Sequence, residues 1–357
     1  MGGAGDIAVI VPTLRRPESL ERALRSLFAQ TGVADRVGEI VVVDNDPRGS
    51  AAALVERLTG QSPWPLVYRH APQPGVATAR NAGLAATTAP LIAFLDDDEA
   101  AAADWLHALI KARETTGADV VFGPIRGRAP DAAPWLQPYL EHFFGREGPR
   151  ATGLIAAPFG CGNSLMTRAT ALPGAAPFNV ASDHAGGEDD ALFAALRTRG
   201  GRFGWAADAW VDEFAPAHRA TLGYALARAF AYGQGPSQTA AAARDWLSVL
   251  RWMTIGAIQA VVWGLQSALL AAARSPKRAQ AYDRAARGVG KILWMKGFEP
   301  HFYGARELAR LDAAAGQDES AAAKQGPESP ESPDRRLKGR VLPECTCQRP
   351  DPTGFGQ

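Results

Sequence analysis

Cysteine is scarce in this sequence, and neither sign of charge is in excess. Only three of the 357 residues are cysteines, and two of them, Cys345 and Cys347, lie in a polar C-terminal segment. A single Cys-x-Cys pair does not complete a zinc site, and so few cysteines are typical of a protein in the reducing cytoplasm. The 38 basic and 37 acidic residues nearly cancel, so nothing in the overall charge indicates nucleic acid as a partner.

Three common sequence signals are absent as well. Residues 1–6 contain neither a basic region nor an apolar core, so we expect no secretory signal and a cytoplasmic location. The turn after the first apolar segment, residues 12–17, contains no glycine, which excludes the Gly-x-Gly-x-x-Gly loop of a dinucleotide-binding domain. A P-loop is not found either. A bound nucleotide would therefore need another way to hold its phosphates.

Apolar segments that predict buried strands alternate with segments that predict helices. Continuous apolar runs are typical of parallel strands that are covered on both faces. We expect strands at residues 7–11, 39–44, 66–68 and 91–95, and helices from Pro17, near residues 50–58 and over 76–86. This alternation predicts an α/β fold with a mainly parallel central sheet.

The strand predicted at residues 91–95 ends in four consecutive carboxylates, Asp96 to Glu99. In an open α/β sheet, ligands bind just beyond the carboxyl ends of the strands. Clustered acids raise each other's pKa values unless a cation lies among them, and a hard divalent ion takes both carboxylate and phosphate oxygens. The cluster therefore predicts a metal that holds phosphates, with a solvated acidic loop that caps the next helix as the alternative.

Four short motifs occur in an order that resembles a known family. They are Val11-Pro12-Thr13, Val43-Asp44-Asn45, Gly75 with Arg80-Asn81-x-Gly83, and Phe94 through Glu99. In order and spacing the chain resembles family 2 glycosyltransferases of the GT-A fold, and particularly the bacterial exopolysaccharide glucosyltransferases of the succinoglycan type. The resemblance extends over residues 7–232. The Gln-x-x-Arg-Trp motif of processive synthases is not found, which favours a transferase that adds a single sugar.

The resemblance implies a nucleotide site at the first three motifs. Pro12 and Thr13 would lie against the nucleoside, and Asp44 would accept a hydrogen bond from the base, for which uracil is favoured. Arg80 and Asn81 would face the nucleotide or its phosphates, a task that suits the fork of donors on arginine. The alternatives are a turn cap for Asp44 and a surface ion pair for Arg80.

The two acidic clusters would then divide the chemistry between them. Asp96 and Asp98 form the Asp-x-Asp pair that would bind Mn²⁺ or Mg²⁺, with Asp96 on the metal or the ribose and Asp97 also at the nucleotide. The metal would neutralise the charge that grows on the leaving nucleoside diphosphate. The second cluster, residues 188–190, opens a helix predicted over 191–199.

Acids at a helix N-terminus are also favoured by the helix dipole, so capping is the alternative for the second cluster. Inverting transfer, however, needs a general base for the acceptor hydroxyl. The Glu-Asp pair of the family places the catalytic role on Asp189, with Glu188 beside it and Glu188 or Asp190 as the alternative base. Two further segments stay open. The aromatic residues within 134–144 predict either an acceptor platform or core packing. Cys161, in a segment that resembles the strand beneath the donor sugar, is interpreted as packing, with a nucleophile as the alternative.

The C-terminal third contains two candidate helices near a membrane. Residues 252–273 lack charge and are long enough to span a bilayer, but polar side chains at 244, 248, 251, 259 and 266 form one stripe. The helix predicted over 276–295 has a basic face and an apolar face, which is typical of a helix in an anionic interface. A helical hairpin packed on the catalytic domain is the alternative.

The sequence as a whole predicts a GT-A domain over residues 1–240, a helical appendage over 241–311, and a disordered tail over 312–357. We expect an inverting, metal-dependent glycosyltransferase with a nucleotide-sugar donor, preferably a UDP-sugar, and a saccharide or polyprenyl-linked acceptor. It would act in cell-surface or exopolysaccharide synthesis, peripherally on the inner face of the plasma membrane. The alternatives are a nucleotidyltransferase, which would want a glycine-rich loop after the first strand, and a catalytically inactive sugar-nucleotide-binding scaffold.

Overall fold

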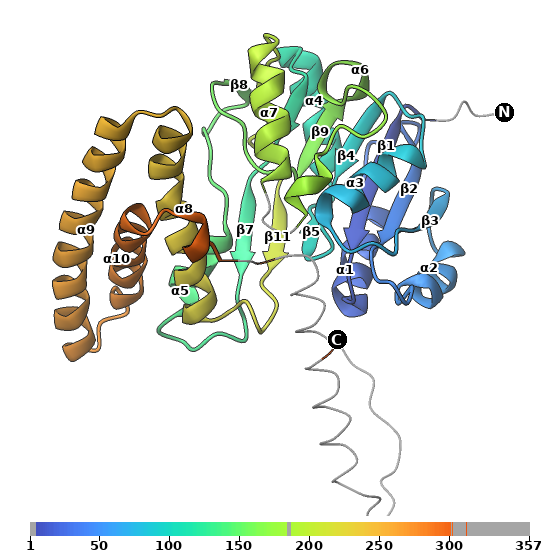
Figure 1. Ribbon diagram of the computed structural model, residues 1–357. Coiled ribbons are helices and arrows are strands. Elements are labelled where there is room, and N and C mark those ends of the chain that lie inside the picture. Colours follow the sequence, from blue (N-terminus) through green and yellow to red (C-terminus); the bar gives the residue numbers. More distant parts are fainter. Residues whose placement is uncertain (1–4, 184–186, 301, 303–311, 313–357) are drawn as a thin grey trace, which may run out of the picture. The chain divides into compact units, whose positions relative to one another are not determined.

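The larger of two sheets forms the centre of the protein. The computed structural model describes residues 5–183, 187–300, 302 and 312, and residues 1–310 belong to one compact unit. Eight strands follow the order β3-β2-β1-β4-β9-β6-β10-β8 (Figure 1). Their bounds are β1 Ile7–Thr13, β2 Val37–Asp44, β3 Leu66–His70, β4 Leu91–Phe94, β6 Val120–Phe122, β8 Gly153–Ile155, β9 Ser164–Thr167 and β10 Phe203–Trp205.

The N-terminal half of this sheet is parallel, and antiparallel strands enter only beyond β4. Strand β1 lies between β2 and β4 and is parallel to both, whereas β9 is antiparallel to its neighbours β4 and β6. Side chains alternate between the two faces of a strand. In β1, Ile7, Val9 and Val11 therefore enter one core, and Ala8 and Ile10 enter the other. The predicted α/β fold with a mainly parallel sheet is confirmed.

Helices cover both faces of this sheet. Helices α1 (Pro17–Phe28), α2 (Ala52–Thr59) and α4 (Trp105–Thr116) contribute to one core. Helices α3 (Val76–Ala85), α6 (Arg168–Ala171) and α7 (Glu188–Thr198) contribute to the other. Burial on both faces explains the continuous apolar runs of the central strands.

A second sheet, which the sequence did not predict, borders the carboxyl end of β4. It has the order β5 (Glu99–Ala101), β11 (Val211–Phe214) and β7 (Ile125–Arg128), and α5 (Gln137–Phe144) packs on β7. Strand β5 begins at the last carboxylate of the first acidic cluster. The short helices η1 (Val180–Ser182) and η2 (Lys296–Phe298) complete the described elements.

Three helices form a bundle at the C-terminal end of the described chain. Helix α10 (Arg278–Ile292) packs on both α8 (Leu222–Ala242) and α9 (Trp246–Ala272). Backbones approach closely there, since a Cβ atom at Gly256 would lie 2.6 Å from the carbonyl oxygen of Gly288. The domain boundary predicted at residue 240 falls inside α8 and stays a prediction. The tail over 312–357, with Cys345 and Cys347, lies outside the described residues except for Asp312.

The aromatic segment over residues 134–144 joins this bundle to the second sheet. Tyr139 and Leu140 are buried, and the Tyr139 hydroxyl donates to Asp283 of α10 at 3.0 Å. The ring of Phe144 stacks on Tyr224 of α8. Core packing, the plainer of the two interpretations, therefore describes this segment.

Helix α10 also differs from its predicted role at a membrane. Ala281, on the apolar face of the helix predicted over 276–295, is 1% exposed, and Arg287 pairs with Asp283 on the same helix. The Nζ atom of Lys291 donates to Gln259 of α9 at 3.0 Å. The prediction that α10 lies with one apolar face in the interface is therefore wrong, because α10 is packed between two helices.

Candidate active site

The site lies where β1, β2 and β4 end side by side. Register pairs Thr13 with Asp44 across β1 and β2, and Ile10 with Phe94 across β1 and β4. The motifs at these three strand ends are therefore neighbours in space, although they are far apart in the sequence. This is the edge of an α/β sheet at which ligands bind.

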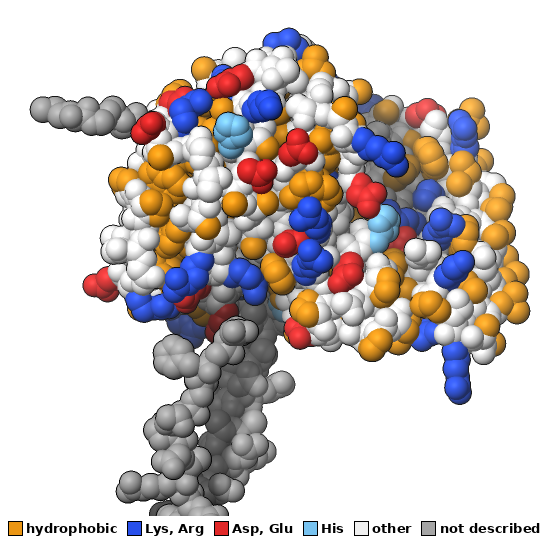
Figure 2. Space-filling model, turned by 180° about the vertical axis from the view of Figure 1, so that it is seen from behind, with side chains coloured by type: hydrophobic (Ala, Val, Ile, Leu, Met, Phe, Trp, Pro, Cys, Tyr) orange, Lys and Arg blue, Asp and Glu red, His pale blue; other side chains and the backbone are white. Residues whose placement is uncertain are grey.

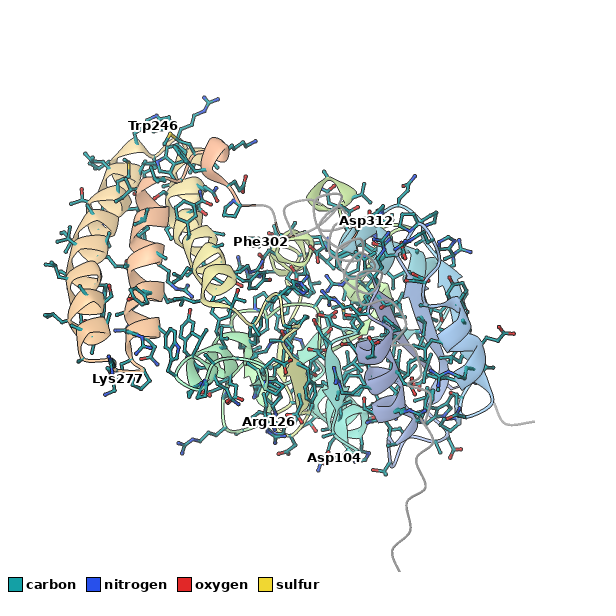
Figure 3. The ribbon with its side chains drawn as sticks, turned by 90° about the horizontal axis from the view of Figure 1, so that it is seen from below. Asp104, Arg126, Trp246, Lys277, Phe302 and Asp312 are labelled. Atoms are coloured by element: carbon teal, nitrogen blue, oxygen red, sulfur yellow. The ribbon has the colours of Figure 1, made fainter. Side chains whose placement is uncertain are left out.

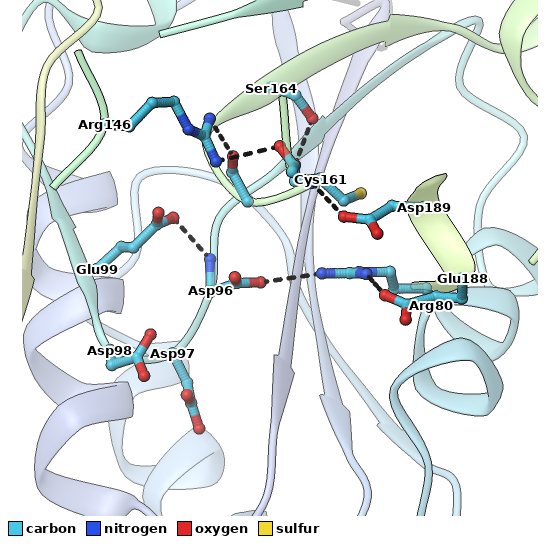
Figure 4. A network of polar contacts seen from close by, with 12 residues as sticks. Arg80, Asp96, Asp97, Asp98, Glu99, Arg146, Cys161, Ser164, Glu188 and Asp189 are labelled. Atoms are coloured by element: carbon cyan, nitrogen blue, oxygen red, sulfur yellow. Dashed lines mark hydrogen bonds and ion pairs between the residues drawn. The ribbon is translucent and has the colours of Figure 1, made fainter. Parts of the chain in front are cut away.

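The carboxylates of the first acidic cluster pair with two different arginines, Arg16 and Arg80. The Nη1 atom of Arg16 donates to Asp97 at 2.9 Å and to Asp98 at 3.0 Å, and the hydroxyl of Thr13 donates to Asp97 at 2.7 Å. The carboxylate of Asp96 points the other way, toward Arg80 (Figure 4). Asp97 thus fastens the end of β1 to the acidic turn, a structural contact beside its predicted place at the nucleotide.

Negative charge is concentrated around this turn. Burial raises the pKa of Glu99 well above its usual range, and the neighbouring Asp96 and Glu213 carboxylates raise it further. Burial, followed by the charges of Asp98 and Asp96, raises the pKa of Glu213 to about 8. Such a site favours a bound cation, because a cation relieves the repulsion that these shifts express.

The donor set fits a hard divalent ion that shares itself with a ligand. Among residues 5–183 and 187–300, no group of three or more His, Cys, Asp or Glu side chains is arranged to hold a metal by itself. Mg²⁺ sites commonly use only one or two carboxylates and take their other ligands from phosphates and water. Asp96, with a side chain that is 38% exposed and faces Arg80, and Asp98, which pairs with Arg16, are the two carboxylates predicted for this role, and their binding of a metal stays a prediction.

Arg80 connects the two acidic clusters. Its guanidinium pairs with Glu188 and lies 3.5 Å from Asp96 Oδ1, and all of this arginine but 5% is buried (Figure 4). The interpretation as a surface ion pair is therefore wrong. Burial raises the pKa of Glu188, and the positive charge of Arg80 opposes that shift. Within the described part of the chain, the Nε atom of Arg80 has no hydrogen-bond partner.

Helix α3, which carries Arg80, is fixed at its N-terminus and near its middle by contacts with distant parts of the chain. Asp183 accepts hydrogen bonds from the backbone N–H groups of Ala77 and Thr78 at 2.7 and 3.2 Å. Asn81 binds the backbone of Phe178 through both ends of its amide, at 2.8 and 3.1 Å. Asn81 therefore positions a loop, and its predicted contact with the nucleotide stays a prediction.

Asp44 has the turn-capping role that the sequence left as the alternative. It is fully buried, and its carboxylate accepts hydrogen bonds from the N–H groups of Asp46 and Ala51 and from the hydroxyl of Tyr68, at 2.7 to 3.0 Å. Pro12 pairs with Val43 at the same edge. The contacts of Asp44 and Pro12 with a nucleoside remain predictions.

Asp189 faces the same space from the N-terminus of α7. Its Oδ2 accepts a hydrogen bond from the N–H of Cys161 at 2.9 Å, and its Oδ1 accepts one from the N–H of Asp190 at 2.9 Å. Both oxygens retain a lone pair, so the carboxylate is oriented and can still accept a proton. The thiol of Cys161 is buried, which raises its pKa, in agreement with a packing role.

Arg146 is a site residue that the sequence did not indicate. Its guanidinium donates to the carbonyl oxygens of Gly162 at 2.9 Å and Gly160 at 3.2 Å, and so holds the segment that binds Asp189. A Cβ atom at Gly162 would lie 2.5 Å from Asp96 Oδ2, so this segment touches both acidic clusters. Arg146 lies outside the four motifs, and its backbone is held beside β7 by the bridge between Ile125 and Arg146.

The fold belongs to a known structural class. It superposes on the mannosyltransferase PcManGT of Pyrobaculum calidifontis, solved in complex with GDP-Man and Mn²⁺, with a TM-score of 0.55 and 18% identity. The match covers 82% of this chain and 88% of that one. This likeness establishes the GT-A glycosyltransferase fold that the sequence predicted.

Sequence comparison places the chain within that class. Residues 8–172 match glycosyl transferase family 2. The chain is 37% identical over 230 residues to the succinoglycan biosynthesis protein ExoM of Rhizobium meliloti. This alignment covers 64% of this chain and 73% of the relative. A validoxylamine A glucosyltransferase of Streptomyces hygroscopicus subsp. limoneus is 30% identical over 149 residues, 41% of this chain and 33% of the relative. The protein therefore belongs to glycosyl transferase family 2.

Proposed function

We propose that this protein transfers a sugar, with inversion, from a nucleotide-sugar donor to a saccharide acceptor. The observation that carries the proposal is the position of Arg80 between Asp96 and Glu188. Through it, a carboxylate suited to a metal and the helix terminus that bears Asp189 share one site. Donor and acceptor chemistry would thus meet at adjacent residues.

On the donor side, Asp96 and Asp98 would hold Mn²⁺ or Mg²⁺, and a UDP-sugar is the favoured donor. The bound metal would supply charge neutralisation for the departing nucleoside diphosphate. The Nε–H of Arg80, which has no partner among the described residues, is a further donor suited to phosphate oxygen, because burial makes an unsatisfied N–H costly. The complex of PcManGT with GDP-Man and Mn²⁺ supports a donor site in which a nucleotide-sugar and a divalent metal bind together.

On the acceptor side, Asp189 would take the proton of the attacking hydroxyl onto a carboxylate oxygen. Its hydrogen bonds with the N–H groups of Cys161 and Asp190 would keep the carboxylate directed at the hydroxyl. Glu188 is paired with Arg80 and is 5% exposed, so it is the weaker candidate for the base. A base must reach the proton that it abstracts.

The acceptor is proposed to be a growing saccharide on a polyprenyl carrier, in cell-surface or exopolysaccharide synthesis. The name of the relative ExoM, a succinoglycan biosynthesis protein, supports a polysaccharide product. A carrier of this kind stays at the membrane, so we place the enzyme peripherally on the inner face of the plasma membrane. A nucleotidyltransferase is disfavoured by the turn after β1, which lacks glycine.

The test is release of UDP from UDP-glucose, with and without Mn²⁺. A metal-dependent transferase releases UDP slowly to water without an acceptor, and EDTA should abolish that release. A nucleotidyltransferase would instead release pyrophosphate from UTP with a sugar phosphate. A sugar-nucleotide-binding scaffold would bind UDP-glucose without turnover, so absence of turnover with every UDP- and GDP-sugar would refute the proposal.

A further inference from the structure

Helix α9 exposes a wide apolar face. Among the described residues it is the helix that is long and apolar enough to cross a membrane, and only 11% of its most apolar window is buried. The large exposed side chains recur every three or four residues, which places them on one side of the helix. They are Leu247, Leu250, Ile258, Val261, Val262, Leu265 and Leu269, each 52 to 80% exposed.

The opposite side of α9 packs on α10. Val249, Gly256 and Ser267 are its buried residues, and Gln259 donates to the carbonyl oxygen of Arg284 at 2.9 Å. The outward face is directed away from the rest of the described chain, between the ends marked by Trp246 and Lys277 (Figure 3). Hydrophobic side chains accordingly appear along the outer edge of the bundle (Figure 2). A face of this size is a docking surface rather than an ordinary solvated one.

The packing of α10 argues against a membrane span. Helix α10 contains five charged residues within Arg278–Ile292, and it runs against α9 at backbone contact. A spanning α9 would carry these charges into hydrocarbon, where ionised side chains are costly. The face is therefore covered by something that lies beside the bundle.

The charge of the bundle indicates what covers it. Residues 222–293 contain nine Lys or Arg and two Asp or Glu, a net charge of +7 in a chain of net charge +1. Arg251 is exposed on α9, and Arg274 and Lys277 are exposed just beyond its end. An apolar helix face bordered by exposed cations matches an anionic lipid surface, which offers acyl chains and negative headgroups together.

We propose that the outward face of α9 lies in the headgroup region of an anionic bilayer, with the helix axis parallel to the membrane. The contact is made by α9, and not by the α10 face that the sequence favoured. A lipid-linked acceptor, as in the proposed function, gives this docking its purpose, but docking itself requires no donor or acceptor. The two proposals can therefore fail separately.

The experiment is co-sedimentation of the full chain with vesicles of phosphatidylcholine, with or without phosphatidylglycerol. The wild type should bind the anionic vesicles and lose about tenfold in bound fraction with neutral ones. The triple variant Ile258→Ser, Val261→Ser, Leu265→Ser should lose binding to both. Leu154→Ser on β8 and Val289→Ser on α10 replace exposed apolar residues elsewhere and should bind like the wild type.

The midpoint of urea denaturation, and release of UDP from UDP-glucose without vesicles, should each be the same in all four proteins, and the urea midpoint shows that the triple variant is folded even if no UDP is released. Binding of the triple variant at the level of the wild type would overturn the proposal. Equal binding of the wild type to neutral vesicles would refute the anionic surface. A wild-type dimer that the triple variant converts to a monomer would identify the face as an interface between copies. If alkaline carbonate does not extract the protein from native membranes, α9 spans the bilayer and the proposal is refuted.

Discussion

Replacement of Arg80 by methionine is the sharpest test of how the two acidic clusters are held together. The Arg80 and Glu188 side chains that pair are each only 6% exposed, whereas the Asp96 side chain is 38% exposed. The variant therefore leaves one buried carboxylate without its cation. Loss of one partner of a buried pair costs about 3–5 kcal/mol, because the remaining charge is uncompensated.

A loss of that size should lower the melting temperature by about 6 °C in a protein of this length, because the entropy of unfolding grows with the number of residues. Glu188→Gln should restore part of the stability in the double variant, about 2 kcal/mol, because the amide carries no charge to compensate. Arg36→Met is a matched control, since Arg36 pairs with Asp6 and Glu114 and all three side chains are over one-third exposed. Loss of these exposed pairs should cost about 1 kcal/mol or less, because solvent screens them.

The free energy of unfolding is measured by urea titration of the wild type, Arg80→Met, Glu188→Gln and the double variant, with EDTA present. The deficit of Arg80→Met should shrink as the pH falls, because burial raises the pKa of Glu188 and protonation removes the uncompensated charge. If the double variant is no more stable than Arg80→Met, or if Arg36→Met loses as much free energy of unfolding as Arg80→Met, then the buried pair of Arg80 and Glu188 does not stabilise the fold as reasoned.

Three further predictions concern the same site. Asp98→Asn should abolish metal-dependent UDP release, with the fold intact by circular dichroism, because one missing charge removes leaving-group stabilisation; activity near the wild-type level would exclude Asp98 as a ligand. Glu213→Gln should raise the free energy of unfolding, by about 2 kcal/mol above pH 8 and little below pH 5, because the folded pKa of about 8 lies above the usual 4.5 and ionisation between them destabilises the fold; a gain that does not grow with pH in urea titrations would contradict this. Arg146→Met should lower kcat about tenfold with an unchanged KM for the donor, since it releases the segment that positions Asp189; partial rescue by Arg146→Lys is expected, and a change in KM alone would refute positioning.

Much of the fold could be predicted from the local pattern of apolar residues. The apolar run at 91–95 became β4 and the buried Leu95, because a strand covered on both faces needs no polar residues. The four motifs met at one edge since parallel strands end together. Their order along the chain was therefore sufficient to predict that Thr13, Asp44 and Asp96 would be neighbours.

What the sequence did not predict depends on contacts between distant segments. Asp183 caps α3 across 106 residues, and Arg146 is held at the active site by a bridge to β7 and by hydrogen bonds with the carbonyl oxygens of Gly160 and Gly162. Neither contact has a local pattern. The basic and apolar faces of the helix at 276–295 were correctly periodic, but periodicity does not say which helix covers which face. In the structure, α8 and α9 cover α10.

The central claim is that Asp189 is the general base, and the comparison of Asp189→Asn with Asp190→Asn tests it most directly. Both variants remove one carboxylate at the start of α7, but the side chain of Asp190 is exposed. With a saccharide acceptor, Asp189→Asn should lower kcat by roughly 10²- to 10⁴-fold and keep its affinity for the donor, whereas Asp190→Asn should remain near the wild type. A loss of kcat in Asp190→Asn with an active Asp189→Asn would contradict the account.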